Sequence, residues 1–124
     1  MSTKNKTKSL LKNFRYDAGP YKIFDEKIIS FLNDVSQAIL NHKSAKFYSD
    51  LATFGFWCRQ KNIKSLANKY VSDNIMIGRG CALHICPTNV PMNFAYSFVF
   101  GLISGNNNIV KIPTRNFTQV QLFF

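Results

Sequence analysis

The sequence predicts a mixed α/β fold, in which an N-terminal helical layer is followed by the start of a parallel sheet. Apolar residues recur at helical spacing through residues 21–74. Between residues 81 and 112, two apolar runs of strand length flank a segment long enough for about three helical turns. A strand, a helix and a second strand in this order form a βαβ unit with parallel strands and a right-handed crossover. The predicted organisation is therefore a basic arm at 1–20, a helical segment at 21–74 and a first βαβ part at 75–124.

The helical segment contains three predicted helices. Asp25 is suited to cap the first, which continues at a spacing of three and four to about Leu40. Ser44 is suited to cap a second helix, and Gly55 inside it indicates close packing against a neighbour. One face of this second helix carries Phe47, Leu51, Phe54 and Cys58. A third, shorter helix is indicated by Ile63, Leu66, Ala67 and Tyr70.

Proline and glycine residues set the predicted boundaries of the strands and the helix in the βαβ unit. The first strand covers residues 81–86, and a proline ends it because proline cannot donate to a ladder. Pro91 suits the first position of the helix, which runs to about Ile103. Gly105 then supplies the left-handed conformation of a helix C-cap, and the second strand covers residues 108–112. A final apolar helix is expected from residue 118 onward.

Residues 75–80 predict a short strand that ends in a Gly-Arg-Gly turn. Without a G-x-G-x-x-G spacing before a helix, a bend between two strands is favoured over a phosphate cradle. On the following strand, His84 and Cys86 share one face and Cys81 lies on the other. Because no second ligand pair occurs at zinc-finger spacing, no metal site is predicted. Ser97 is expected to pack or to bond a backbone carbonyl.

Composition limits the classes of function. The 124 residues are 46% apolar with twelve phenylalanines, which is ample for a packed core. No apolar run reaches the ~18–20 residues of a membrane span, and three cysteines without a disulfide framework fit a reducing cytoplasm. The net charge is +10; five of the sixteen basic residues cluster in the N-terminal arm and the others are scattered, without the ordered arginine and aromatic stripe that reads nucleic acid. Phosphorylated ligands or an acidic partner protein suit this charge better.

Several ordered motifs carry a resemblance to a known family. Residues 87–91, Pro-Thr-Asn-Val-Pro, resemble the P-W-N-F-P loop of the aldehyde dehydrogenase superfamily, and residues 105–111 resemble its G-N-x-x-V-x-K strand. The bacterial long-chain acyl-CoA reductases, known from bioluminescence operons, are more similar still. Their G-R-G, H-I-x-P-x-N-V-P, Y-S and G-x-x-x-G-N-x-N-I-V-K motifs occur in order within residues 78–111, and residues 56–59 are similar to their F-W-x-R segment.

This resemblance implies a Rossmann-like, incomplete aldehyde dehydrogenase fold. The chain would be the N-terminal part of an enzyme whose catalytic cysteine, pyrophosphate loop and oligomerisation strand lie beyond residue 124. The expected reaction is NADPH-dependent reduction of a long-chain acyl thioester, from acyl-CoA or an acyl-protein, to a fatty aldehyde through a cysteine thioester. Acyl-transfer proteins are expected partners, the complete enzyme is expected to be an oligomer, and this chain alone is expected to be inactive.

The resemblance also implies roles for four residues. Asn89 would hold the oxyanion formed on the acyl carbonyl. Lys111 would bind the adenosine ribose of NADPH or its phosphate, although Ile112 separates it from the proline that most aldehyde dehydrogenases have next. Thr114 and Arg115 follow and are candidates to reach the 2′-phosphate.

Each role has a plainer alternative. From spacing alone, Asn89 suits an N-cap or an Asx turn before the proline, and Lys111 suits a solvated strand end. For the whole chain, the alternative to an enzyme is a non-catalytic basic module or remnant that docks an acidic or acylated partner.

Overall fold

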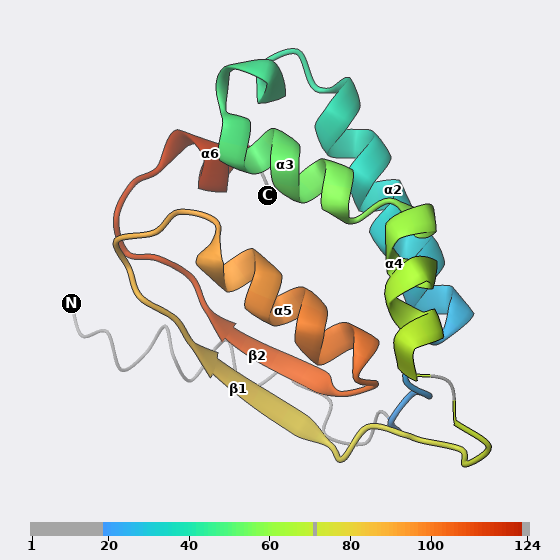
Figure 1. The fold of residues 1–124 in the computed structure, drawn as a ribbon. Helices are drawn as coiled ribbons and strands as arrows, with labels where there is room; N and C mark the ends of the chain where they lie inside the picture. Colours follow the sequence, from blue (N-terminus) through green and yellow to red (C-terminus); the bar gives the residue numbers. More distant parts are fainter. Residues whose placement is uncertain (1–18, 71, 123–124) are drawn as a thin grey trace.

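A computed structural model of the chain describes residues 19–70 and 72–122 and shows a small parallel sheet with helices stacked on one side (Figure 1). The predicted basic arm at 1–20 lies outside the described residues except for its last two. The helices are α2 (Glu26–Asn41), α3 (Ser49–Trp57), α4 (Gln60–Ala67), α5 (Asn93–Ile103) and α6 (Thr118–Gln121), and 3-10 turns cover Ala45–Phe47 and Asn68–Tyr70. The strands are β1 (Cys81–Ile85) and β2 (Asn107–Lys111).

The βαβ unit forms as predicted. β1 and β2 pair in parallel, with Cys81 opposite Asn107 and Ile85 opposite Lys111, and α5 connects them. Each strand begins or ends within one residue of its predicted bound. Figure 1 shows α5 lying between the sheet on one side and α2, α3 and α4 on the other. A mixed α/β class is therefore confirmed for the described part of the chain.

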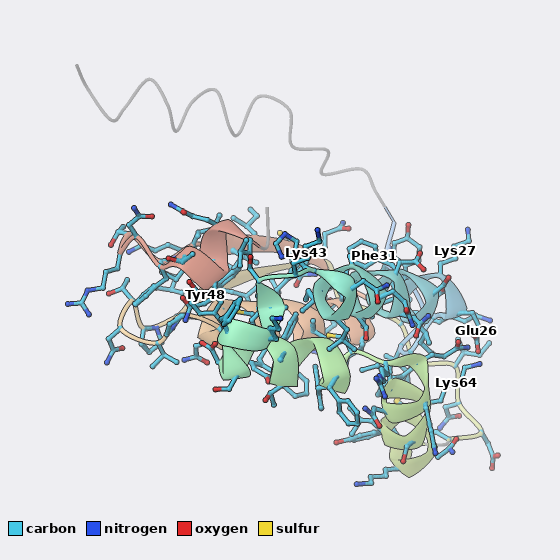
Figure 2. The ribbon with its side chains drawn as sticks, turned by 90° about the horizontal axis from the view of Figure 1, so that it is seen from above. Glu26, Lys27, Phe31, Lys43, Tyr48 and Lys64 are labelled. Carbon is cyan, nitrogen blue, oxygen red and sulfur yellow. The ribbon has the colours of Figure 1, made fainter. Side chains whose placement is uncertain are left out.

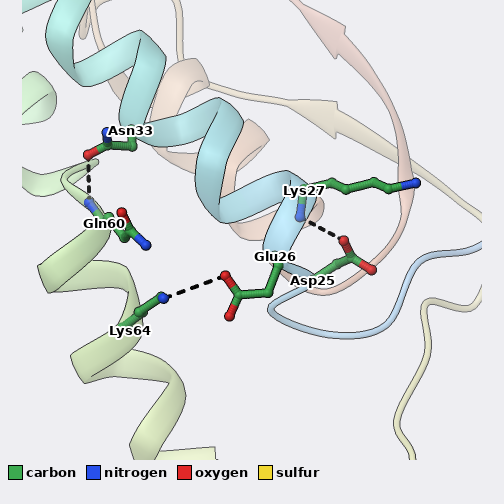
Figure 3. Close-up of polar contacts among 6 residues, drawn as sticks. All are labelled: Asp25, Glu26, Lys27, Asn33, Gln60 and Lys64. Carbon is green, nitrogen blue, oxygen red and sulfur yellow. Dashed lines mark hydrogen bonds and ion pairs between the residues drawn. The ribbon is translucent and has the colours of Figure 1, made fainter.

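The first predicted helix is confirmed as α2. Asp25 caps it, because its carboxylate accepts a hydrogen bond from the backbone N–H of Lys27 at 2.8 Å. α4 docks against the same helix through two polar contacts, one at its first residue and one in its last turn (Figure 3). The backbone N–H of Gln60 donates to Asn33 Oδ1 at 3.1 Å, and Lys64 lies 3.5 Å from Glu26. Both side chains of this ion pair are exposed, so their contribution to stability is small.

The second predicted helix is wrong in its first half. Residues 45–47 form a 3-10 turn, Ser44 makes no capping hydrogen bond, and α3 begins only at Ser49. Phe47, which was expected on the buried face, is 75% exposed. The start of α3 instead uses Asp50, whose carboxylate accepts from the N–H of Leu51 and from Gln119 near the other end of the chain. The contact between Asp50 and Gln119 joins residues far apart in the sequence, and apolar periodicity does not reveal it.

Only the C-terminal end of α5 agrees with the prediction. Pro91 is not its first residue, because Pro91 lies in a turn, Met92 occupies the cap position and the helix begins at Asn93. At the other end Gly105 has φ of 78°, as a left-handed C-cap requires. The N–H of Gly105 donates to Leu102 O at 2.9 Å and that of Asn106 to Gly101 O at 3.1 Å. This pair of bonds is a Schellman motif, and it turns the chain directly into β2.

The strand predicted at 75–80 is also wrong. Only an isolated antiparallel bridge forms there, between Lys22 and Ile77. The Gly-Arg-Gly segment after it ends in a bend at Gly80 as predicted, but of the two strands expected around it only β1 forms. Its backbone N–H groups are already used, because those of Arg79 and Gly80 donate to Asn106 Oδ1 at 2.7 and 3.2 Å. A phosphate would have to displace this side chain to reach them.

One hydrophobic core joins the helices to the sheet. Its most deeply buried side chains come from α2, α3, α4 and α5, including Leu32, Leu51, Phe54, Ile63 and Val99. Gly55 is closely packed as predicted, because a Cβ there would lie 2.8 Å from Ile39 Cγ2. Across residues 19–70 and 72–122, every helix is too short or too polar to cross a lipid bilayer.

Candidate functional site

The candidate site lies where the two parallel strands end. Ile85 and Lys111 are register partners and the last residues of β1 and β2, so the loops that follow them leave the same edge of the sheet. Asn89 lies in the first loop, and Thr114 and Arg115 lie in the second. All of these residues except Ile85 were predicted to be functional, and all are exposed to solvent. In open α/β sheets this carboxyl edge is where ligands bind.

The amide of Asn89 is free to act on a ligand. Within the described part of the chain, the cap of α5 is Met92, and no side chain bonds the first turn of the helix. The interpretation of Asn89 as an N-cap is therefore wrong. An Asx turn would need a backbone N–H two residues later, and Pro91 has none. In the described part of the chain, Oδ1 of Asn89 therefore takes part in neither an N-cap nor an Asx turn.

Lys111 lies on the face of the sheet that points away from α5. His84 and Asn108 contact the α5 side, so alternation places Leu83, Ile109 and Lys111 on the opposite face. Lys111 is exposed and has no ion pair within residues 19–70 and 72–122. Its ammonium group, together with the Thr114 hydroxyl and the Arg115 guanidinium in the next loop, suits a phosphorylated ribose. Their role in binding a cofactor stays a prediction.

A polar network behind the site was not predicted. His84 on β1 bonds Ser97 Oγ of α5 through Nδ1 at 2.8 Å and Asn108 Oδ1 of β2 through Nε2 at 2.7 Å. The amide of Asn108 donates to the carbonyl of Asn106 at 2.8 Å, which fixes its Oδ1 as an acceptor. In the neutral ring, Nε2 of His84 therefore donates and Nδ1 accepts from the Ser97 hydroxyl. Ser97 was expected to pack or to bond a backbone carbonyl; it is half-buried, and its hydroxyl bonds His84 instead of a carbonyl.

The network holds both strands and the helix in one register. Gly101 permits it, because a Cβ at this position would overlap Asn108 Oδ1 and lie 2.8 Å from His84 Nε2. At the other end, Asn106 connects the network to the Gly-Arg-Gly bend. The sequence signal that could have identified this network is the set of polar residues on the helix-facing side of two otherwise apolar strands. Such residues need partners when they are partly buried.

The three cysteines differ in their capacity to act as nucleophiles. Cys58 is buried at the end of α3, and burial raises the pKa of its thiol to about 12, so it carries no thiolate near neutral pH. Cys81 is exposed at the start of β1, far along the strand from the loop of Asn89, and Cys86 is half-buried against the core. In the described ranges, no three His, Cys, Asp or Glu side chains are grouped so as to hold a metal ion.

Fold and site together describe a mixed α/β protein with exposed polar residues at the carboxyl edge of a parallel βαβ unit. Comparisons of the chain with protein-family models, with curated proteins and with solved structures give no match.

Proposed function

We propose that this chain supplies the oxyanion-binding amide and part of the cofactor site of a long-chain acyl-CoA reductase. The observation that carries the proposal is the position of Asn89, which is exposed in the loop at the carboxyl end of β1. Its side chain neither caps α5 nor forms an Asx turn. An exposed side-chain amide at this position can donate a hydrogen bond to an oxygen that becomes negative during reaction. The motif resemblance around the same residue supports the same role.

The proposed reaction transfers an acyl group from its thioester to a cysteine of the complete enzyme. The resemblance implies that the nucleophile would be a cysteine beyond residue 124, because the positions of Cys58, Cys81 and Cys86 correspond to helix and strand residues of that family. The amide of Asn89 would stabilise the oxyanion of each tetrahedral intermediate. NADPH supplies the hydride that converts the enzyme thioester to the aldehyde. Lys111, Thr114 and Arg115 would hold the phosphorylated ribose of the cofactor by charge and hydrogen bonding.

The test is the reductase activity of the complete enzyme with and without this amide. Asn89→Ala should lower turnover of a long-chain acyl-CoA, followed by NADPH absorbance, by ~10²–10³-fold. Unfolding midpoints should not change, because the side chain is exposed and makes no capping bond. Thr88→Ala, at the neighbouring exposed position of the same turn, is the matched control and should keep full turnover.

Two results would count against the proposal. Equal turnover in Asn89→Ala and the wild type would remove Asn89 from the site. A complete enzyme that oxidises no NADPH with any acyl-CoA or acyl-protein would instead favour a non-catalytic module. The two outcomes are distinct, because the first leaves the reaction in place and the second does not.

A further inference from the structure

One edge of β1 has no pairing strand in the described part of the chain. The sheet order is β1-β2, and in Figure 1 β1 (yellow) has β2 along one side and no labelled helix or strand along the other. The N–H of Asn107 donates to the carbonyl of Gly80 at 2.8 Å, which fixes the direction of the parallel ladder. By alternation, every second residue of β1 turns its N–H and C=O away from β2. These residues are Cys81, Leu83 and Ile85, and across 19–70 and 72–122 their backbone groups make no hydrogen bond.

This edge lacks the features that usually protect an edge strand from pairing. Natural edge strands carry lysines, prolines or bulges that block an added strand. β1 has none of these, because its sequence is Cys-Ala-Leu-His-Ile and its register with β2 is unbroken. The second edge strand, β2, ends in Lys111 and is followed by Pro113 two residues later. An added strand is therefore expected on β1.

The residues with outward backbone groups also present apolar side chains. Leu83 and Ile85 are largely exposed, on the face of the sheet that points away from α5. In an antiparallel pair, residues that exchange hydrogen bonds lie directly opposite each other, with their side chains on the same face. Every second side chain of an added strand would then lie beside Leu83 and Ile85. Apolar residues at those positions would remove this surface from water.

The charge around the edge has one sign. Arg79 lies two residues before β1, and Lys111 ends β2 beside the last residue of β1. Residues 74–122 contain no aspartate or glutamate, because the described carboxylates all precede them. Figure 2 labels one of these carboxylates, Glu26 on α2, which pairs with Lys64 of α4. A strand that complements the edge is therefore acidic at both ends, and a second copy of this basic chain is a poorer match.

We propose that the free edge of β1 binds an extended segment of a partner protein as an added antiparallel strand. The segment is apolar at alternate positions and carries a carboxylate near each end. Antiparallel pairing is the more stable per residue, and an antiparallel edge strand is common on otherwise parallel sheets. The proposal does not depend on Asn89, so strand binding can fail while reductase activity survives, and the reverse also holds.

The test is a titration of the 124-residue chain into the fluorescent peptide Glu-Thr-Val-Thr-Val-Thr-Val-Thr-Glu, followed by anisotropy at low salt. Its valines would lie opposite Cys81, Leu83 and Ile85, and its glutamates near Arg79 and Lys111. N-methyl groups on two valines remove donors that face β1 and should weaken binding ~10-fold. N-methyl groups on the two central threonines, whose N–H groups face away, give the matched control, which should bind as the parent peptide does.

The contribution of charge is tested on the chain. Arg79→Glu should weaken binding of the parent peptide at least ~3-fold at low salt, because it places a carboxylate near a glutamate of the peptide. The backbone bond from Arg79 to Asn106 does not involve the replaced side chain. Lys61→Glu makes the same change of net charge at an exposed position of α4 and should bind as the wild type does.

Three results would overturn the proposal. They are a wild-type chain that does not bind the parent peptide, equal binding of the two N-methylated peptides, and equal binding by Arg79→Glu and Lys61→Glu. A chain that ignores the peptide but dimerises at low salt would assign the edge to a second copy. Binding lost with the threonine-methylated peptide and kept with the valine-methylated one would overturn the antiparallel direction and indicate a parallel strand.

Discussion

The thiol of Cys58 lies in the hydrophobic core, where burial disfavours its charged thiolate form. It has no exposed surface, and desolvation raises its pKa from 9.0 to about 12. In the unfolded chain the thiol ionises near its ordinary value, whereas in the folded chain it stays protonated. A group whose pKa is raised on folding stabilises the native state fully below its unfolded pKa. That stabilisation is lost as the pH rises towards the folded value.

We therefore expect alkaline destabilisation that depends on Cys58. Between pH 9 and pH 12 the wild type should lose stability faster than Cys58→Ala, with a difference approaching ~1.4 kcal/mol per pH unit. Below pH 9 the two proteins should differ by a constant amount, due to the small cavity left by the sulfur. Urea unfolding midpoints, measured with reductant present, give both quantities. Cys86→Ala is the control, and parallel curves for wild type and Cys58→Ala would contradict the prediction.

The residues of the candidate site were easier to predict from the sequence than the hydrogen-bond partners of the side chains around them. Asn89 and Lys111 were selected from motif and strand position, and the structure places both at one edge of the sheet. The partners of Ser97 were not predictable, because its hydrogen-bond acceptor His84 lies on another element. Side-chain pairing across elements depends on register, and a single sequence contains no direct record of register.

At the scale of helices and strands, a boundary was predicted correctly where residues at that boundary determine it. α2 begins at its predicted cap, and Gly105 ends α5 because the backbone there needs a positive φ. The helix predicted from Ser44 failed because its apolar periodicity continues across a 3-10 turn, where Phe47 remains in solvent. The strand predicted within 75–80 is reduced to a single bridge, because its pairing with the segment around Lys22 does not extend beyond Ile77.

The turn at Gly105 should be the most sensitive connection between elements. Gly105→Ala places a Cβ in a left-handed conformation, which costs ~1–2 kcal/mol, and the new atom would also overlap the backbone oxygen of Tyr21. The total loss of stability should therefore exceed ~2 kcal/mol, measured as the free energy of unfolding in urea. Gly19→Ala is the matched control, because a Cβ there meets nothing within 4 Å. Equal stability of the two variants would show that the loop adapts and that the Schellman motif is not required.

At the scale of the whole molecule, the sheet is covered on one face only in the part of the chain that the structure describes. Leu83 and Ile85 are 65% and 71% exposed on the face opposite α5. Parallel sheets in stable proteins are covered on both faces. The net charge of +10 opposes association between copies, whereas this apolar face favours it. Salt should shift the balance, because it screens the repulsion but not the apolar attraction.

We expect the isolated chain to self-associate through this face as salt is added. Leu83→Lys should reduce association, measured by sedimentation velocity over a salt series, because it places a charge at the centre of the exposed apolar surface. Its register partner is Ile109, so no like charge lies directly opposite and stability should change by less than ~0.5 kcal/mol. Phe47→Lys makes the same kind of change at a residue that is 75% exposed on the helical side. If both variants reduced association equally, net charge would be the cause and the sheet face would have no special role.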